Sequence, residues 1–117
     1  MPRTVLIVDD HPSFRASARR VLEDAGYQVI GEAADGGSAL VAARALRPTI
    51  VLLDIQLPDI DGFDVAARLT GQDDAPMVVL TSSRDGADFS GMVARSGARG
   101  FVPKAELSGG ALEELLD

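Results

Sequence analysis

The chain contains no cysteine and no tryptophan, and it has a single lysine, Lys104, and a single histidine, His11. The absence of cysteine excludes disulfides, thiolate catalysis and cysteine-ligated zinc. One histidine cannot build a multi-histidine metal centre. With only four Phe and one Tyr, the core must consist of Val, Leu, Ile and Ala, as in a parallel sheet buried between helices.

Positive charge is also scarce, since 11 Lys and Arg against 18 Asp and Glu give a net charge of −7. Phosphate contacts need a clustered basic surface, so we expect no direct nucleic-acid binding by this segment. No apolar run approaches the roughly 20 residues that span a bilayer, and charge follows the first run at once instead of a signal-peptide cleavage site. We therefore expect a soluble, cytoplasmic chain without membrane association, folded as one domain over residues 1–117.

Short apolar runs alternate with helical patterns along the whole chain. The runs predict strands over 5–8, 27–33, 49–54, 77–81 and 100–102. Helical spacing predicts helices over 13–25 and 62–69, one capped by Asp35 that ends before Pro48, one carrying Phe89, Met92 and Val93, and one capped by Ser108. Repeated βα units with short loops predict an α/β fold with helices on both faces of a doubly wound parallel sheet. We expect the flavodoxin-like strand order 2-1-3-4-5, with its switch point between the first and third strands.

Polar residues end four of these runs: Asp9-Asp10, Asp54, Thr81 and Lys104. Ligands of open parallel sheets bind outside the carboxyl ends of the strands, so these side chains should meet. Clustered carboxylates repel one another unless a cation joins them, and carboxylates with a carbonyl and water are ligands that Mg²⁺ selects. Each aspartate alone could equally cap a helix or close a turn. Their joint occurrence with the hydroxyl and the lysine favours a metal-assisted phosphate site.

At this point the residues resemble a known family. The Asp-Asp pair, the segments 54–62 and 97–104 and the pair Thr81-Ser82 together resemble the receiver domain of two-component response regulators, over essentially the whole chain. The resemblance implies that Asp54 accepts a phosphoryl group from a phosphohistidine of a sensor histidine kinase.

The resemblance also implies roles for the neighbouring residues. Mg²⁺ would be held by Asp10, Asp54 and the main-chain carbonyl of Gln56, with Asp9 acting largely through bound water. Lys104 and Thr81 would contact the phosphate. Such a domain promotes its own phosphorylation and dephosphorylation and is not a turnover enzyme.

Further implied features concern signalling. Phe101, three residues before Lys104, matches the switch aromatic, although an ordinary core Phe fits the same position. Signalling would change the face formed by the fourth helix, the fifth strand and the fifth helix, with rearrangement of the polar loop 82–88. That face, or the nearby surface of the first helix, would then self-associate or dock an output domain. The sequences DDHP and GEAADG are similar to the subgroup with a C-terminal helix-turn-helix DNA-binding domain, which is not present in this chain.

Two departures from the family pattern affect the lysine end of the site. The spacing from Thr81 to Lys104 is one residue longer than usual, so either Thr81 or Ser82 could be the phosphate-binding hydroxyl; the position five residues after Pro76 favours Thr81. The lysine lies between Pro103 and Ala105 and is not followed by the usual proline. His11 is expected on the rim of the site.

Three other functions fit the pattern less well. A phosphatase of the haloacid dehalogenase type would need an acid where Gln56 stands, and an FMN-binding domain would need a Ser/Thr/Gly-rich loop in place of the acidic DDHPSF. A receiver-like interaction module that works without phosphorylation remains the main alternative. Such modules usually lack the acidic pair, the acceptor or the lysine, and this chain has all of them.

Overall fold

The structure is a computed structural model that describes residues 3–83 and 89–116. Its strands are β1 Thr4–Val8, β2 Gln28–Ala33, β3 Ile50–Asp54, β4 Met77–Ser82 and β5 Gly100–Pro103. Its helices are α1 Pro12–Asp24, α2 Gly36–Leu46, α3 Gly62–Thr70, α4 Ser90–Arg95 and α5 Gly109–Leu116, with a 3₁₀ turn, η2, over Lys104–Glu106. The helix and strand bounds differ from the sequence expectation mainly at element ends. Most of the loop expected over 82–88 lies outside the described residues.

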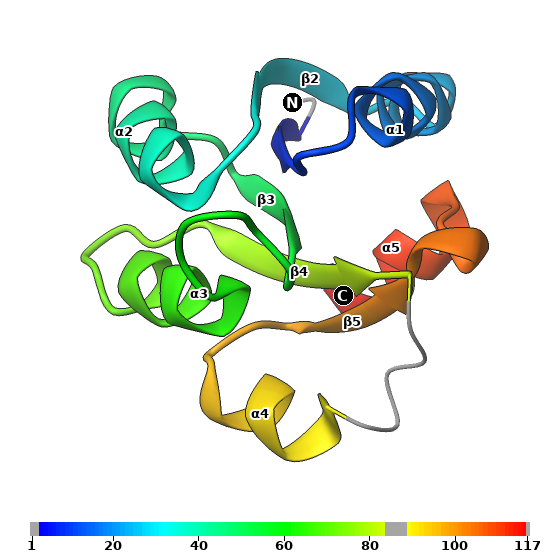
Figure 1. Cartoon of the computed structure of the whole chain (residues 1–117). Coiled ribbons are helices and arrows are strands. Elements are labelled where there is room, and N and C mark those ends of the chain that lie inside the picture. The colour runs from blue at the N-terminus through cyan, green and yellow to red at the C-terminus, as the bar shows by residue number, and fades with distance from the viewer. Residues whose placement is uncertain (1–2, 84–88, 117) are drawn as a thin grey trace.

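The five strands form one parallel sheet in the order β2-β1-β3-β4-β5, which confirms the predicted flavodoxin-like topology. The central strand β3 is buried along its whole length, as its nearly continuous apolar sequence predicts. Figure 1 shows helices on both faces of the twisted sheet, with α2 and α3 on one side and α1 and α5 on the other.

Each face of the sheet carries its own apolar core because successive strand residues point to opposite sides. One core joins Leu6, Val8, Val51, Leu53 and Leu80 to α2 and α3. The other joins Val5, Ile7, Leu52 and Val79 to α1 and α5, and its helix residues are Ala18, Leu22, Leu112 and Leu116. The side chain at the end of each strand therefore lies on the same face as the residue two positions before it in that strand.

Helix starts follow the capping signals in the sequence. The Asp35 carboxylate accepts a hydrogen bond from the backbone N–H of Ser38 at 2.7 Å, and Ser108 Oγ accepts one from the N–H of Ala111 at 3.0 Å. Both bonds satisfy N–H groups that the first helical turn leaves without an intrahelical partner. Both predicted caps are confirmed.

Helix α4 differs from the other four helices. It is six residues long, and no residue of Ser90–Arg95 is buried. It is held by half-buried apolar side chains such as Phe89 and Val93, which pack on the α2–α3 side of the core, and by its buried C-cap Ser96, whose carbonyl accepts a hydrogen bond from Thr70 Oγ1 at 3.0 Å. Few buried contacts mean a low local stability, so α4 is the helix most easily displaced.

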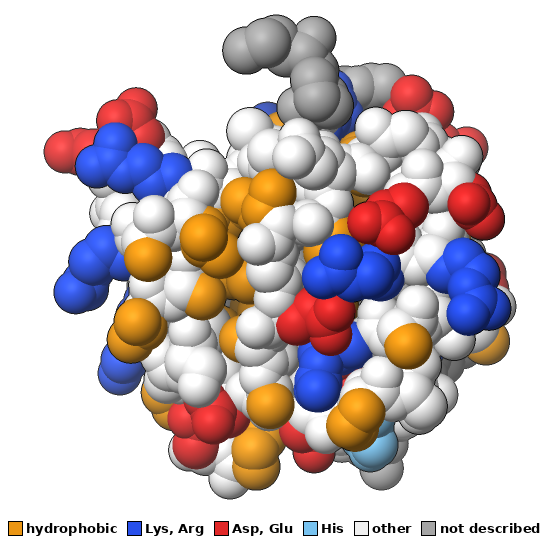
Figure 2. Space-filling model, turned by 90° about the horizontal axis from the view of Figure 1, so that it is seen from above, with side chains coloured by type: hydrophobic (Ala, Val, Ile, Leu, Met, Phe, Trp, Pro, Cys, Tyr) orange, Lys and Arg blue, Asp and Glu red, His pale blue; other side chains and the backbone are white. Residues whose placement is uncertain are grey.

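The outer surface over α1, β2 and α2 is divided by residue type. Figure 2 shows basic and acidic side chains intermingled over α1 and the adjoining edge of β2, and apolar side chains gathered over α2. The charged part includes Glu32, which pairs with the guanidinium groups of Arg15 and Arg19, each at 3.0 Å. Within residues 3–83 and 89–116, no helix has the length and apolar character needed to cross a membrane.

Candidate phosphate and metal site

The sheet register brings three polar side chains to one place. Asp54 ends β3 and pairs with Thr81 of β4, while Asp9 follows Val8, whose partner on β3 is Leu53. By strand alternation, all three lie on the same face as Ile7, Leu52 and Val79, toward α1 and α5. All three are buried. The predicted convergence at the carboxyl edge of the sheet is therefore present.

Asp54 is 2% exposed and uses its two carboxylate oxygens differently. Oδ1 accepts a hydrogen bond from the backbone N–H of Gln56 at 3.0 Å, and Oδ2 lies 3.2 Å from Nζ of Lys104. Burial, and secondly the nearby charge of Asp9, raise the pKa of Asp54 above its ordinary value, although the Gln56 N–H and Lys104 oppose the shift. The ionised carboxylate is therefore held in surroundings that only partly compensate its charge.

The loop after β3 is shaped by close packing at Gly62, the first residue of α3. A Cβ atom at this position would lie 2.4 Å from the carbonyl oxygen of Asp54 and 2.4 Å from Cα of Ile55. The N–H of Gly62 also donates to the carbonyl of Ile55 at 3.1 Å. Only glycine lets the start of α3 approach so closely, and this approach fixes the backbone that carries Asp54.

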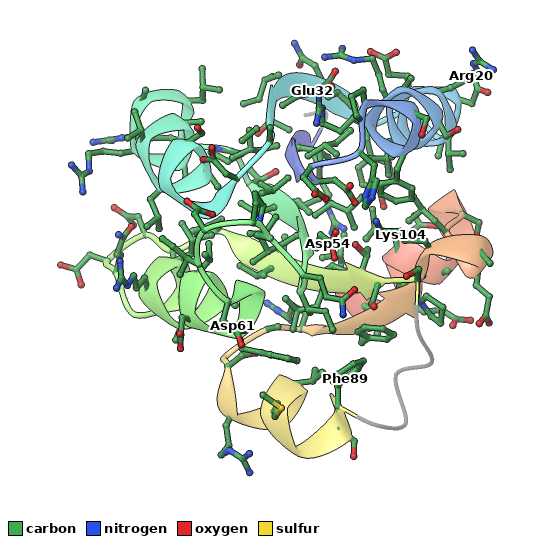
Figure 3. The ribbon with its side chains drawn as sticks, in the orientation of Figure 1. Arg20, Glu32, Asp54, Asp61, Phe89 and Lys104 are labelled. Atoms are coloured by element: carbon green, nitrogen blue, oxygen red, sulfur yellow. The ribbon has the colours of Figure 1, made fainter. Side chains whose placement is uncertain are left out.

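Lys104 bridges the carboxylates of Asp9 and Asp54, with Nζ 2.6 Å from Oδ2 of Asp9. Figure 3 shows Asp54 and Lys104 side by side at the carboxyl edge of the sheet. Burial alone would lower the pKa of Lys104, but the close ion pair with Asp9 and the charge of Asp54 outweigh it and raise this pKa. The ammonium also lies 4.6 Å from the centre of the Phe14 ring of α1, a distance that allows a cation–π contact. Lys104 is thus held as a cation where a phosphoryl oxygen could reach it.

Asp10 and His11 lie at the solvent side of this cluster. The Asp10 side chain is 35% exposed and His11 is 66% exposed, in agreement with the predicted rim position of His11. One ligand atom from each of Asp9, Asp10, His11 and Asp54 lies within 4.8 Å of the others. Carboxylate oxygens gathered in this way fit a hard divalent cation such as Mg²⁺.

Thr81 and Ser82 are both buried but differ in hydrogen bonding and in direction. Thr81 Oγ1 has no hydrogen-bond partner among the described residues, whereas Ser82 has a partner. By alternation Thr81 shares the face of Asp54, and Ser82 faces the other side, with Leu80. A buried hydroxyl without a partner is costly unless a ligand completes it, so this geometry favours Thr81 over Ser82 as the phosphate-binding hydroxyl.

Phe101 lies on the opposite face of the sheet from Thr81. It pairs in register with Leu80 and packs against the α2–α3 core. Its ring centre is 6.1 Å from that of Phe89, which is in turn 6.0 Å from Phe63. This aromatic row, Phe63–Phe89–Phe101, connects β5 to the segment just before α4.

Two contacts near the site have no clear signal in the sequence. Phe14 reads as an ordinary apolar residue of α1, yet its ring faces the Lys104 ammonium. Arg15 reads as a surface residue, yet its guanidinium donates a hydrogen bond to the carbonyl of Asp9. The helical spacing of 13–25 predicts which face of α1 is buried but not which side chain of that helix reaches the strand ends.

The fold and this cluster together define a class: an open, doubly wound α/β domain with an acidic pocket and a lysine at the carboxyl edge of its sheet. The family model for the response regulator receiver domain matches residues 5–116. The chain belongs to this family, whose members are receiver domains of two-component response regulators.

Individual relatives agree with this assignment. The transcription regulator BvgA of Bordetella pertussis is 40% identical over 106 residues, which cover 91% of this chain and 51% of BvgA. The transcriptional regulatory protein PdtaR of Mycobacterium tuberculosis is 31% identical over 124 residues, covering 98% of this chain and 60% of PdtaR. The chain thus spans about half the length of BvgA.

Solved structures show the same fold. A two-component response regulator of the LuxR family from Aurantimonas superposes with a TM-score of 0.86 at 31% identity, covering 97% of this chain and 81% of that chain. The chemotaxis response regulator CheY4 of Vibrio cholerae gives a TM-score of 0.84 at 27% identity, covering 99% of this chain and 97% of that one.

Proposed function

We propose that this chain is a phosphoacceptor switch whose acceptor is Asp54, and that residues 1–117 act as one receiver domain in the cytoplasm. The observation that carries the proposal is the setting of Asp54: a buried carboxylate beside a lysine, with a buried hydroxyl on the same face, Thr81 Oγ1, that has no hydrogen-bond partner within residues 3–83 and 89–116. A phosphoryl group on Asp54 would supply acceptors for both donors at once.

In the proposed reaction, a carboxylate oxygen of Asp54 attacks the phosphorus of a phosphohistidine on a sensor histidine kinase. The new O–P bond forms as the P–N bond breaks, and the histidine nitrogen leaves with the electron pair. Lys104 balances negative charge on the transferred oxygens, and Thr81 donates its hydroxyl to one of them. The domain promotes its own phosphorylation and dephosphorylation and is not a turnover enzyme.

Mg²⁺ fits the donor set of this pocket. Asp10, Asp54 and the carbonyl of Gln56 would hold it directly and Asp9 largely through water, because both oxygens of Asp9 already have partners: the His11 N–H at 2.8 Å and Lys104. A bound Mg²⁺ would neutralise charge on the phosphoryl oxygens. Its positive charge would also offset the repulsion among the carboxylates of Asp9, Asp10 and Asp54.

Phosphorylation would be read out at the α4–β5–α5 face, with Thr81, Ser82 and Phe101 as the switch residues. Recruitment of Thr81 to the phosphate pulls the end of β4, and Ser82, the next residue, faces the side of the sheet on which Phe101 packs. The Phe63–Phe89–Phe101 row then couples β5 to α4, the least buried helix. We propose that this face self-associates or docks a C-terminal DNA-binding output domain.

The proposal is tested by incubating the chain with acetyl phosphate and Mg²⁺ and mapping the product by mass spectrometry. We expect one base-labile phosphate on Asp54 and none on the Asp54→Asn variant. An Asp54→Asn protein that is modified at the wild-type rate would refute the assignment and favour the phosphorylation-independent interaction module.

The readout is tested separately with beryllofluoride, a phosphoryl mimic, and Mg²⁺. We expect chemical-shift changes at Thr81, Ser82 and Phe101 and an increase in molecular size by light scattering. Unchanged shifts at these residues would exclude the switch even if Asp54 is phosphorylated.

A further inference from the structure

The ring of Phe14 is held in place by the apolar core on the α1 and α5 side of the sheet. Phe14, Ala18 and Leu22 lie four residues apart on one stripe of α1, and Ala18 and Leu22 are fully buried in this core. Phe14 is one turn nearer the carboxyl edge of the sheet, where it is half-buried and packs against the same core. The fold therefore sets the position of this ring independently of the charges of the site.

Three groups of the described residues surround the ammonium of Lys104, which has three N–H donors. Oδ2 of Asp9 lies 2.6 Å from Nζ, and Oδ2 of Asp54 lies 3.2 Å from it. The third group is the Phe14 ring, whose centre is 4.6 Å from Nζ. Because the Lys104 side chain is only 15% exposed, water screens these contacts little. A cation–π contact is stronger when it is desolvated in this way.

The three groups differ in what the proposed reaction does to them. The carboxylates of Asp9 and Asp54 also serve the metal site, and phosphorylation makes one oxygen of Asp54 part of an acyl phosphate. Lys104 must then exchange a carboxylate oxygen for a phosphoryl oxygen. The Phe14 ring neither binds a metal ion nor reacts, so this contact can be the same before and after the transfer.

We propose that Phe14 is a positioning residue for the phosphorylation of Asp54: its ring keeps the Lys104 ammonium beside the acceptor while the ammonium exchanges a carboxylate for a phosphoryl partner. The inference rests on the proposed function, because it needs Asp54 to be the acceptor. An ammonium that is already in place stabilises the charge that develops on the transferred oxygens without first having to be ordered. An apolar side chain without a ring would fill the same space but would not attract the cation.

The first test compares the rates at which acetyl phosphate labels Asp54 at saturating Mg²⁺ in the wild type, Phe14→Leu and Phe14→Tyr. Leucine keeps an apolar contact with the core and removes the ring, so we expect the rate to fall about fivefold. Tyrosine keeps the aromatic ring and should retain the wild-type rate.

The matched control for lost core packing is Met77→Ala. Met77 is a half-buried residue of the same core and lies at the amino end of β4, away from Lys104. We expect this variant to have a lower free energy of unfolding in urea and an unchanged labelling rate.

The second test observes Lys104 directly, because it is the single lysine of the chain. In a protein labelled with ¹³C at lysine, the methylene group next to Nζ gives one isolated signal. The ring current of Phe14 should shift the protons of this group upfield in the wild type and not in Phe14→Leu. The upfield shift should persist when beryllofluoride and Mg²⁺ are added.

Four outcomes would each overturn the inference: a wild-type labelling rate in Phe14→Leu, an equal loss of rate in Phe14→Tyr, an equal loss in Met77→Ala, or loss of the upfield shift when beryllofluoride binds. Failure of the proposed function looks different, because the wild type itself would then carry no phosphate on Asp54.

Discussion

Asp54 and Asp59 flank the turn that leads from β3 toward α3, and their surroundings differ in burial and in hydrogen bonding. Asp54 is buried, accepts one backbone N–H and shares Lys104 with Asp9. Asp59 is exposed, yet its carboxylate accepts three backbone N–H groups, from Gly36 at 2.7 Å, Gly37 at 2.9 Å and Ile60 at 2.9 Å.

The two pKa values shift in opposite directions as a result. Hydrogen bonds from the N–H groups of Gly36 and then Gly37 lower the pKa of Asp59, whereas burial raises that of Asp54. Gly36 and Gly37 open α2, so the Asp59 charge also lies at the positive end of a helix dipole. The charge of Asp59 is thus stabilised by three N–H groups, whereas the charge of the buried Asp54 is only partly compensated by the Gln56 N–H and Lys104. A buried carboxylate whose charge is only partly compensated, such as Asp54, gains most from a bound cation.

The contact between α3 and the backbone of Asp54 can be broken by Gly62→Ala. The added Cβ would lie 2.4 Å from backbone atoms that cannot move aside, so we expect a loss of about 3 kcal/mol in the free energy of unfolding, measured with urea. Gly110→Ala is the matched control, because no heavy atom lies within 4 Å of its added Cβ, and it should be neutral or stabilising. Similar losses in both variants would show that the close approach at Gly62 does not matter.

Mg²⁺ should supply the compensation that Asp54 lacks. At a concentration about 100-fold above its dissociation constant, it should stabilise the fold by about 2.7 kcal/mol, seen as a rise in melting temperature. Asp10→Ala should reduce this gain more than Asp9→Ala does, since Asp9 is already engaged by Lys104 and by the His11 N–H. A larger reduction for Asp9→Ala would mean that Asp9, and not Asp10, is the more important ligand of the ion.

Removing the charge of Asp54 should stabilise the metal-free protein. Asp54→Asn keeps an oxygen for the Gln56 N–H and removes the repulsion with Asp9, so we expect a gain on the order of 1 kcal/mol at neutral pH. The measurement is thermal unfolding in the presence of a chelator. If the variant melted lower than wild type, the Lys104 contact would outweigh burial, and the cluster would be a structural ion pair.

The same substitution at Asp59 should have the opposite sign and a smaller size. Asp59→Asn keeps the side-chain shape but loses the charge that the N–H groups of Gly36 and Gly37 stabilise, so the melting temperature should fall slightly. The exposed Asp73, which follows α3 and lies outside any helix, offers a control, Asp73→Asn, which changes the net charge equally. A fall as large for the control would mean that only net charge matters.

The contrast between these aspartates could be predicted from the sequence only in part. The apolar run before Asp54 predicts its burial. The repeated βα pattern and the strand order expected from it predict the meeting of Asp54 with Asp9. Asp59 carries no such signal: its partners Gly36 and Gly37 lie more than 20 positions away along the chain, and the contact exists only once α2 and the β3–α3 turn pack together.

The rest of the site shows the same difference between features set by local sequence patterns and contacts that depend on tertiary packing. The spacing from Pro76 favours Thr81 over Ser82 without excluding Ser82. Strand register puts Thr81 on the face of Asp54, and its hydroxyl has no hydrogen-bond partner in the described part of the chain. The contact of Phe14 with Lys104 likewise depends on how α1 packs against η2 and not on any local pattern.

The smallest expected effect is in the pH dependence of these stability differences. Because the folded pKa of Asp59 lies below its ordinary value of 3.8, its stabilisation is fully present above that pH and is lost as the pH falls through the folded pKa. The folded pKa of Asp54 lies above 3.8, so its destabilisation is present at neutral pH and disappears as the pH falls through that raised pKa. The advantage of Asp54→Asn over wild type should therefore vanish at a higher pH than the deficit of Asp59→Asn. Urea unfolding of the three proteins across the acid range measures both differences. If the two curves collapsed at the same pH, the two carboxylates would titrate alike, and burial at Asp54 would not be what distinguishes it.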